Sequence, residues 1–344
     1  MPDKSFLFEF IRSYFFQQVE IPPKTGILVA CSGGPDSVAL VQLLASMKPA
    51  LPFKFRLAHI NHHLRGNASN QDERFVRNLA GRVGWPFFRA DGRIQRYRGN
   101  LEEQARDCRY RALAKIARRT KCRLIVTAHT MDDQVETILM NIFRGSGVDG
   151  LAGMAPLRHF GGSNLMLGRP LLGVSKKELL RFLVRSKLSF RTDQSNSDLN
   201  YQRNWLRKRL IPLIEKRNPG FQSRLNQLAL IFNDEKEFWS DYLRKMETEL
   251  LKKYRSGALL DLGGALSYPP AAQRRFFRRI LGGDLMTFET IERLRKWMQG
   301  PPSSGRIFEL RKGWTVERLS KSQGAPSPRL FWFKTPTKKD KNQS

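Results

Sequence analysis

The stretch with the clearest chemical potential is Ser-Gly-Gly-Pro-Asp-Ser at residues 32–37, directly after a short apolar run at residues 27–31. Two glycines allow the backbone to turn sharply and to approach a ligand closely. Pro35 suits the first position of a helix, where its missing N–H costs nothing. The free N–H groups of such a strand–turn–helix junction converge on one concavity that favours phosphate. The sequence therefore predicts a phosphate-binding loop.

The spacing of this loop excludes two common nucleotide-binding motifs, because neither G-x-x-x-x-G-K-[ST] nor G-x-G-x-x-G is present. The loop instead resembles the pyrophosphate loop of the ATP pyrophosphatases, which split ATP into AMP and pyrophosphate. That resemblance implies that the amides of Gly33 and Gly34 hold phosphates. The hydroxyls of Ser32 and Ser37 join them, and Asp36 holds Mg²⁺ as a hard oxygen ligand. An ordinary tight turn would not need this combination of residues.

A second polar stretch, residues 129–137, follows a later apolar run. Asp133 and Glu136 are three positions apart on one expected helix face, so both carboxylates can point the same way. Such a pair could hold Mg²⁺ or an ammonium group, and His129 and the preceding strand end place it beside the loop. The alternative is that acids here only complement the helix dipole, which we favour for Asp132 alone.

The elements that must position these groups alternate along the chain. Strands are expected at residues 24–31, 53–61, 86–90, 123–128 and 165–169, and helices at residues 5–18, 37–47, 70–83, 100–119, 130–144 and from Ser175. This alternation predicts an α/β fold with a doubly wound parallel sheet. Ligands of such sheets lie at the carboxyl ends of the strands, where the polar residues gather.

A strong breaker, Asn-Pro-Gly at residues 218–220, predicts that a first domain covers residues 1–217. Residues 218–333 are expected to form a smaller, mainly α, α+β accessory domain. Its expected helices are residues 221–254, 269–281 and 287–298, with strands at 306–310, 314–319 and 329–333. The basic tail, residues 334–344, is expected to be disordered.

The formal net charge is +30, from 61 Lys plus Arg against 31 Asp plus Glu among 344 residues. A protein this basic usually meets a polyanion, and nucleic acid is the first candidate. A membrane partner is not expected, because no apolar run has spanning length and no signal peptide is evident. The cysteines Cys31, Cys108 and Cys122 form no C-x-x-C pair, which fits a reducing cytoplasm.

Several motifs together resemble the tRNA(Ile)-lysidine synthetase family of the PP-loop superfamily. They are S-G-G-P-D-S, N-H-H-L-R-G, L-E-E-Q-A-R-x-x-R-Y, T-A-H-T-x-D-D-Q-V-E-T, the connector G-x-G-x-x-G-L-A-G-M-x-P, and Y-Q-R-N-W-L-R-K-R-L-I-P-L. The resemblance is close over residues 26–213 and looser afterwards, where a shorter form of the family is expected. Thr130 departs from it, since many members have a second His there. The implied fold is the adenine nucleotide alpha hydrolase-like PP-loop domain.

The resemblance implies a ligase that acts in two steps. ATP adenylates the carbonyl oxygen of the wobble cytidine in a tRNA(Ile) with a CAU anticodon, and pyrophosphate leaves. The amino group of free L-lysine then displaces AMP and gives lysidine. The implied cofactors are ATP and Mg²⁺, the implied location is the cytoplasm, and a homodimer is the default assembly.

Residue roles also follow from the resemblance. The catalytic set is Asp36, Asp133, Glu136, Arg109 and Arg203, of which the acids would hold the incoming lysine or metal and the arginines its carboxylate or phosphates. His129 would line the nucleotide pocket. Arg109 is as readily a solvated helix residue. The expected tRNA contacts are Arg207, Arg274, Arg275, Arg278 and Arg279, although a plain amphipathic helix explains residues 274–279 equally well.

Three other functions compete with this reading. A tRNA thiolase of the same superfamily would typically need paired cysteines, and an amidotransferase relative would need a glutaminase and would not explain the charge. A non-catalytic RNA-binding relic is the third, but the complete loop argues against it.

Overall fold

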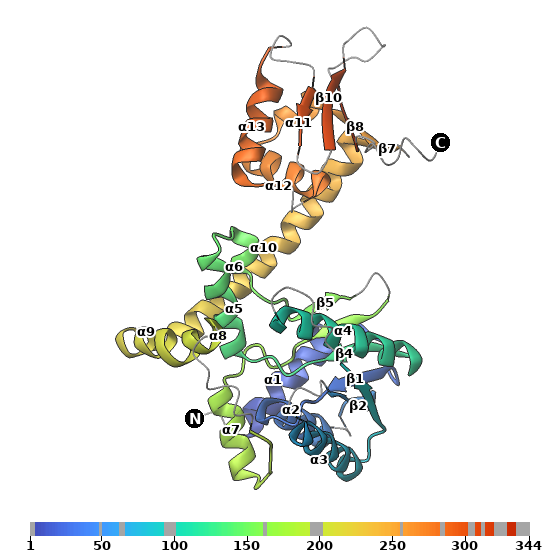
Figure 1. Cartoon of the computed structure of the whole chain (residues 1–344), viewed down its shortest axis with the longest axis vertical. Coiled ribbons are helices and arrows are strands. Elements are labelled where there is room, and N and C mark those ends of the chain that lie inside the picture. Colours follow the sequence, from blue (N-terminus) through green and yellow to red (C-terminus); the bar gives the residue numbers. More distant parts are fainter. Residues whose placement is uncertain are drawn as a thin grey trace. The chain divides into compact units, whose positions relative to one another are not determined.

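The structure is a computed structural model that describes residues 4–47, 50–61, 66–92, 101–160, 164–192, 202–254, 257–282, 286–301, 307–310, 314–319 and 329–334. It divides into two compact units, Met1–Asn233 and Asp234–Ser344 (Figure 1). Several predicted features lie outside the described residues: His62 to Arg65 of the N-H-H-L-R-G motif, the first residue of the helix expected at 100–119, Tyr201 of the Y-Q-R-N-W motif, Arg306, and the tail beyond Lys334.

The first unit is built on a six-stranded sheet with the order β3-β2-β1-β4-β6-β5. Neighbouring strands run parallel, except that β5 runs antiparallel to β6. The strands are β1 (Gly26–Ala30), β2 (Lys54–Asn61), β3 (Phe87–Asp91), β4 (Cys122–Val126), β5 (Leu157–His159) and β6 (Met166–Gly168). The predicted α/β class and parallel sheet are confirmed. The short edge strand β5 was not predicted, because its three residues carry no apolar alternation.

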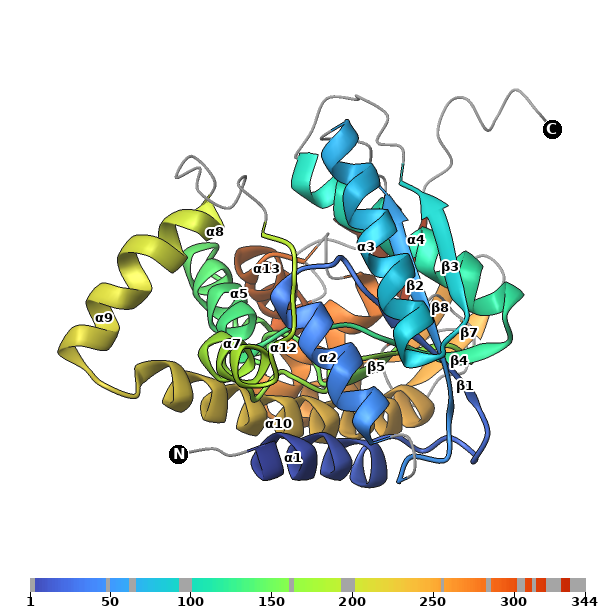
Figure 2. The same ribbon diagram turned by 90° about the horizontal axis from the view of Figure 1, so that it is seen from below.

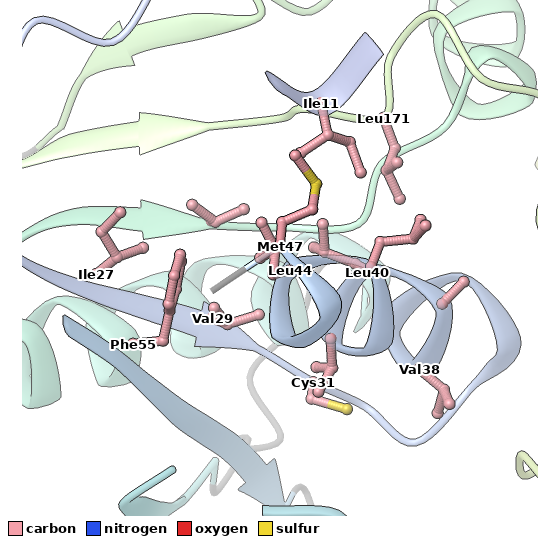
Figure 3. Packing of buried hydrophobic residues seen from close by; sticks show 14 of the residues in the cluster. Ile11, Ile27, Val29, Cys31, Val38, Leu40, Leu44, Met47, Phe55 and Leu171 are labelled. Atoms are coloured by element: carbon pink, nitrogen blue, oxygen red, sulfur yellow. The ribbon is translucent and has the colours of Figure 1, made fainter. Parts of the chain in front are cut away.

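Helices cover both faces of this sheet, as a doubly wound fold requires. Successive side chains of β1 point to opposite faces. Ile27 and Val29 pack into a cluster with α1 (Lys4–Gln17), α2 (Pro35–Ser46), α3 (Asn67–Val83) and α7 (Lys176–Arg185). Leu28 packs with α4 (Leu101–Arg119) on the other face. Figure 1 shows α4 and α2 on opposite sides of β1, and Figure 3 shows Leu40 and Leu44 of α2 beside Val29.

The remaining helices of the first unit lie after the sheet's central strands in the chain. They are α5 (Met131–Phe143), α6 (Val148–Leu151), α8 (Gln202–Trp205), a π-helical turn η2 (Leu206–Leu210), α9 (Ile211–Arg217) and the start of α10 (Phe221–Leu250). Val135 and Leu139 of α5 pack against Leu206 and Ile211. Figures 1 and 2 both show α8 next to α5. This small apolar contact fixes the arginine-rich turn η2 against α5.

The second unit is α+β, as predicted. Its antiparallel sheet has the order β7-β8-β11-β10-β9. Phe276 and Phe277 are fully buried in its core. Its elements are β7 (Leu251–Tyr254), β8 (Gly257–Asp261), α11 (Leu262–Ser267), α12 (Pro270–Leu281), α13 (Phe288–Gln299), β9 (Ile307–Glu309), β10 (Trp314–Leu319) and β11 (Arg329–Lys334).

The helix expected at residues 221–254 ends earlier than predicted, at Leu250. The next four residues form β7, which pairs antiparallel with β8. Cross-strand hydrogen bonds satisfy this backbone, so the tertiary pairing overrides the local helix preference. Lys334, expected in the tail, is the last residue of β11.

The division between the two units falls within the sequence of α10, after Asn233. The predicted boundary after Arg217 falls at the turn between α9 and α10, where Glu215 accepts hydrogen bonds from the backbone N–H groups of Gly220 (2.7 Å) and Gln222 (3.1 Å). That boundary stays a prediction. In the described parts of the chain, no helix is long and apolar enough to cross a membrane.

The hydroxyl of Tyr14 links α1 to the sheet edge and predicts a stability effect. It donates to the Pro156 carbonyl (3.0 Å) and accepts from the backbone N–H of Arg169 (3.2 Å). Tyr14→Phe should lower the free energy of unfolding by about 1–2 kcal/mol, because two hydrogen bonds are lost, while the Arg169 N–H and the Pro156 carbonyl keep their bond to each other (2.8 Å). Tyr268→Phe is the matched control: its hydroxyl bonds Glu249 at the surface, and chemical denaturation should show a change within about 0.5 kcal/mol. Equal effects of the two variants would contradict the assignment.

Candidate nucleotide and cation site

The predicted phosphate loop connects β1 to α2. Gly33 has φ +92°, a left-handed conformation that side chains rarely adopt. Gly34 precedes α2 without a capping side chain, and Pro35 occupies the helix's first turn. The N–H groups of the first turn of α2 therefore have no side-chain cap and face the loop, as expected for an anion-binding junction.

Two loop hydroxyls are held within this junction. The Ser37 hydroxyl donates to the Gly34 carbonyl (2.9 Å), and the two serine oxygens of Ser32 and Ser37 lie 3.3 Å apart. Ser37 is buried, whereas Ser32 is exposed. The hydroxyl of Ser32 is thus accessible to a ligand, while that of Ser37 is held at the base of the loop.

Residues from two other segments fix the loop. The ring Nδ1 of buried His59, in β2, lies 2.9 Å from the Cys31 carbonyl. Burial lowers the pKa of His59, so the neutral ring donates this hydrogen bond. From the segment after α7, the backbone N–H of Arg191 donates to the Gly33 carbonyl (2.9 Å), and its side chain pairs with Asp72 of α3 (2.9 Å).

A cluster of charged side chains lies at the start of α5, with Asp133 at its centre. Asp133 Oδ2 accepts from the backbone N–H of Thr130 (3.0 Å) and from its hydroxyl (3.1 Å), which completes a capping box. Asp133 Oδ1 accepts from the Lys176 ammonium at 2.8 Å. Burial alone would raise the pKa of Asp133, but Lys176 outweighs it and holds the pKa at about 2. Asp133 is therefore ionised at neutral pH.

Lys176 is the first residue of α7, and three contacts hold it in the cluster. Asp132 Oδ2 accepts from its backbone N–H at 2.8 Å. Its ammonium lies 2.8 Å from Asp133 Oδ1 and 3.9 Å from Asp36 Oδ2. Burial alone would lower the pKa of Lys176, but the carboxylate of Asp133 more than compensates and the pKa lies above its ordinary value. Lys176 is thus a cation between two carboxylates.

Glu136 forms the second ion pair of the cluster. Its side chain is fully buried, and Arg207 of η2 binds it with two hydrogen bonds, Nε to Oε1 (2.7 Å) and Nη2 to Oε2 (3.0 Å). Burial raises the pKa of Glu136, and Arg207 offsets part of that rise. The π-helical turn places Arg207 on the face of this helical segment that meets α5, and such turns are frequent at functional sites.

Among the described residues of this cluster, Asp36 is the acid with a buried oxygen that has no hydrogen-bond partner. Its Oδ1 is buried and makes no hydrogen bond. Burial raises its pKa to about 6; Lys176 attracts the carboxylate, while Asp133 and Asp132 repel it. An oxygen in this state accepts a hard cation readily, because the cation would replace a missing partner.

His129 and Arg169 lie on the other side of Asp133. The Thr127 hydroxyl lies 2.8 Å from Nδ1 of His129. Burial and the charge of Arg169 lower the pKa of His129 to about 3, so the ring is neutral. Arg169 is itself buried, and its Nη1 donates to the Ala155 carbonyl (2.6 Å). The site therefore has an acidic side around Asp133 and a basic side around Arg169.

These residues fit a Mg²⁺ ion that arrives with a nucleotide. Within the described ranges, no three His, Cys, Asp or Glu side chains form a metal-binding group. Mg²⁺ bound to phosphates needs only one or two protein carboxylates. Asp36, with its unpartnered Oδ1 beside the loop, would supply one.

The structure brings most of the predicted site residues together. The loop residues, Asp36, Asp133 and Glu136 share one region, and Arg207, an expected tRNA contact, is bound to Glu136. Arg109 is exposed on α4 and within electrostatic range of His59 and His129. Arg203 lies on α8, in the helical segment that continues into η2. The roles of all these residues stay predictions.

The four arginines predicted for tRNA lie on α12, in the second unit. Arg274 pairs with Glu292 (2.7 Å) and Arg279 with Glu247 (2.5 Å). Arg275 lies over the Trp239 ring at 4.9 Å, and Arg278 is exposed. Both phenylalanines of this helix point inward, as the amphipathic pattern predicted.

Sequence reasoning missed Lys176, Arg169 and Arg191. Lys176 lies between Ser175 and Glu178, whose spacing is typical of a capping box and therefore predicts only the start of a helix. Arg169 ends a short apolar run, and Arg191 belongs to an arginine-rich stretch with no periodicity. Only the packing of distant segments gives these residues a site.

A phosphate loop between β1 and α2, on a doubly wound sheet with an acidic cluster at its edge, defines a nucleotide-binding α/β protein. The PP-loop domain family matches residues 9–214, and the chain belongs to this family. A PP-loop domain implies ATP binding.

The chain is similar to curated tRNA(Ile)-lysidine synthases. The protein from Geobacter sulfurreducens is 32% identical over 86% of this chain and 64% of its own length. The protein from Symbiobacterium thermophilum is 35% identical over 70% of this chain and 50% of its own length. The protein from Geobacillus kaustophilus is 28% identical over 95% of this chain and 73% of its own length. This chain thus spans 64% and 50% of the first two relatives. In fold it is similar to the U34-tRNA thiolase NcsA from Methanococcus maripaludis, with TM-score 0.55 and 16% identity over 66% of this chain and 78% of that one.

The opposite pKa shifts of the two central acids predict opposite effects on stability. The pKa of Asp36 is raised in the folded state, so its ionised form destabilises the fold above about pH 6 and the penalty disappears below about pH 4. Asp36→Asn should therefore stabilise the protein at pH 7, by up to about 3 kcal/mol, and the gain should shrink as the pH falls.

Asp133→Asn is the matched variant: the chemical change is the same, but the expected change in the free energy of unfolding has the opposite sign. The depressed pKa of Asp133 stabilises the fold above about pH 4, and this contribution is lost as the pH falls toward 2. The variant should cost about 2 kcal/mol at pH 7. Urea titrations of both variants from pH 4 to pH 8 test the pair, and the same sign of change at pH 7 would refute the assigned charge states.

Proposed function

We propose that this chain ligates free L-lysine to the wobble cytidine of tRNA(Ile) with a CAU anticodon, in the cytoplasm, with ATP and Mg²⁺ as cofactors. The products are lysidine, AMP and pyrophosphate. The similarity to curated lysidine synthases supports this proposal, and the net charge of +30 suits an RNA substrate. The observation that carries it is the unpartnered Asp36 oxygen beside the phosphate loop, one lysine side chain away from Asp133.

In the first step, the cytidine carbonyl oxygen attacks the α-phosphorus of ATP, and the bond to pyrophosphate breaks. The loop amides and the hydroxyl of exposed Ser32 would bind the phosphates. Asp36 would hold the Mg²⁺ that neutralises their charge. His129 lines the nucleotide side in this scheme, and its low pKa suits a neutral hydrogen-bonding ring rather than a base.

In the second step, the ε-amine of lysine attacks the activated ring carbon, the bond to the AMP oxygen breaks, and the nitrogen loses a proton. AMP is a far better leaving group than a carbonyl oxygen. Asp133, ionised at neutral pH, would hold an ammonium group of the incoming amino acid. Buried Glu136 is already bound by Arg207, so its role would be to position that arginine. Arg109 and Arg203 are candidates for the carboxylate or the phosphates.

Two of the competing functions, the tRNA thiolase and the RNA-binding relic, have less support from the structure. Cys31 and Cys122 are buried free thiols in clusters on opposite faces of the sheet, which does not suit the cysteine pair of a thiolase. A non-catalytic RNA-binding relic would have no use for the combination of an intact loop with a buried, unpartnered Asp36. A homodimer also remains part of the proposal, and light scattering would test it.

The first test of the function measures pyrophosphate release and attachment of radiolabelled lysine to a tRNA(Ile) transcript. Wild type should release pyrophosphate only with the CAU transcript and should attach lysine, and Asp36→Ala should lose both activities. Lys177→Met, which changes an exposed residue of α7, is the control. Release without lysine attachment would point to a different nucleophile, and no release would favour the RNA-binding relic.

The pairing of the α12 arginines predicts which of them contributes to RNA binding. Arg278 is exposed, whereas Arg274 and Arg279 are in ion pairs. Arg278→Ala should weaken tRNA binding and reduce the salt slope by about one. Arg278→Lys keeps the charge and should retain the slope. Filter binding across a salt series tests this, and an unchanged slope in Arg278→Ala would exclude a phosphate contact.

A further inference from the structure

The contacts of Asp133 leave one position for a ligand, and a side chain of the protein fills it. Oδ2 of Asp133 is used by the backbone and hydroxyl of Thr130. Oδ1 is therefore the oxygen that can face a substrate, and the Lys176 ammonium occupies it at 2.8 Å. A substrate ammonium can bind Asp133 only if Lys176 moves.

Lys176 is the more mobile of the two cations on Asp133. Arg207, whose Nη2 lies 3.6 Å from the same oxygen, is bound by two hydrogen bonds to fully buried Glu136. Moving Arg207 would leave a buried carboxylate without a partner. The ammonium of Lys176 instead has one short contact, to Asp133, and ends a flexible four-carbon chain.

The backbone of Lys176 is fixed, so only its side chain needs to move. Ser175 and Glu178 form a capping box around the start of α7. Asp132 accepts from the backbone N–H of Lys176 at 2.8 Å. The Lys176 ammonium can therefore move only as far as its side chain allows. It already lies 3.9 Å from Oδ2 of Asp36, which stands in the first turn of α2 beside the phosphate loop.

A nucleotide would supply the new partner. Mg²⁺ would bind the unpartnered Oδ1 of Asp36, whereas Lys176 lies nearest to the other oxygen, Oδ2. The phosphates that come with it would carry more negative charge than one carboxylate, and they would lie beside Asp36, 3.9 Å from which the Lys176 ammonium already stands. Once Lys176 pairs with them, Oδ1 of Asp133 is open.

We propose that Lys176 makes binding ordered: it blocks the ammonium position on Asp133 until ATP arrives, and only the nucleotide-bound protein accepts free lysine. The inference rests on the proposed function, because it uses lysine as the second substrate. It assigns to Lys176 a positioning role that neither the phosphate loop nor the acidic pair can fulfil.

The test measures binding of radiolabelled lysine by equilibrium dialysis, with and without Mg²⁺ and a non-hydrolysable ATP analogue, for wild type, Lys176→Met and Lys177→Met. In wild type, the analogue should tighten lysine binding at least about five-fold, the low end of typical coupling between two sites. Lys176→Met should bind lysine equally well with and without the analogue. Lys177→Met, on the exposed face of α7, should behave as wild type.

Lys176→Arg serves as the conservative variant, because it keeps a cation at this position and should retain the nucleotide dependence. Circular dichroism of both variants would reveal a folding defect. If Lys176→Met does not fold, Lys176→Arg still tests the proposal. Equal lysine affinity of wild type with and without the analogue would overturn the proposal, and so would an unchanged nucleotide dependence in folded Lys176→Met.

The lysine-attachment assay on wild type distinguishes failure of the ordered binding from failure of the proposed function. Attachment to tRNA(Ile) without nucleotide-dependent lysine binding would refute the ordering and keep the proposed function. No attachment, with pyrophosphate still released, would refute the proposed function itself.

Discussion

The need to compensate a partly buried carboxylate, that of Asp133, organises the site. One oxygen completes the cap of α5, and the other faces Lys176 from α7 and Arg207 from η2. Each of these partners comes from a different part of the chain, and each is held by a further acid, Asp132 or Glu136. Charges at this depth are tolerated only with such partners. The result is a junction of α5, α7 and η2 beside the phosphate loop, held together by ion pairs and hydrogen bonds.

Asp36 is the exception within this network, and the exception is informative. Both oxygens of Asp133 and of Glu136 accept hydrogen bonds, whereas Asp36 Oδ1 has none and its pKa is raised to about 6. A fold selected for stability alone would not keep a carboxylate in that position. Sites that bind a cation commonly retain such an unfavourable arrangement, because the ligand relieves it.

The basic side of the site contains a buried positive charge, that of Arg169, as the acidic side contains buried or partly buried negative charges. Arg169 is buried and helps to keep His129 neutral. Arg169 offers a buried positive charge to an anion, whereas Asp36 and Asp133 offer carboxylate oxygens to a cation. This separation of charge across a few residues suits substrates that carry both signs, such as Mg²⁺-bound ATP or an amino acid.

The sequence alone determined the local features: the strand–loop–helix of residues 26–46, the alternation behind the parallel sheet, and the paired acids on α5. These follow from backbone preferences and periodicity, which act over a few residues. Sequence reasoning predicted an end of α10 that was too late, and it missed β5. In both places, pairing with a neighbouring strand sets the backbone conformation. The partners of the acids were decided by tertiary structure alone. Lys176 and Arg207 lie far from Asp133 in the chain, and no local pattern distinguishes a lysine in a helix cap from one that neutralises a distant carboxylate. Charge compensation acts through space, so only the folded chain shows which cation meets which acid.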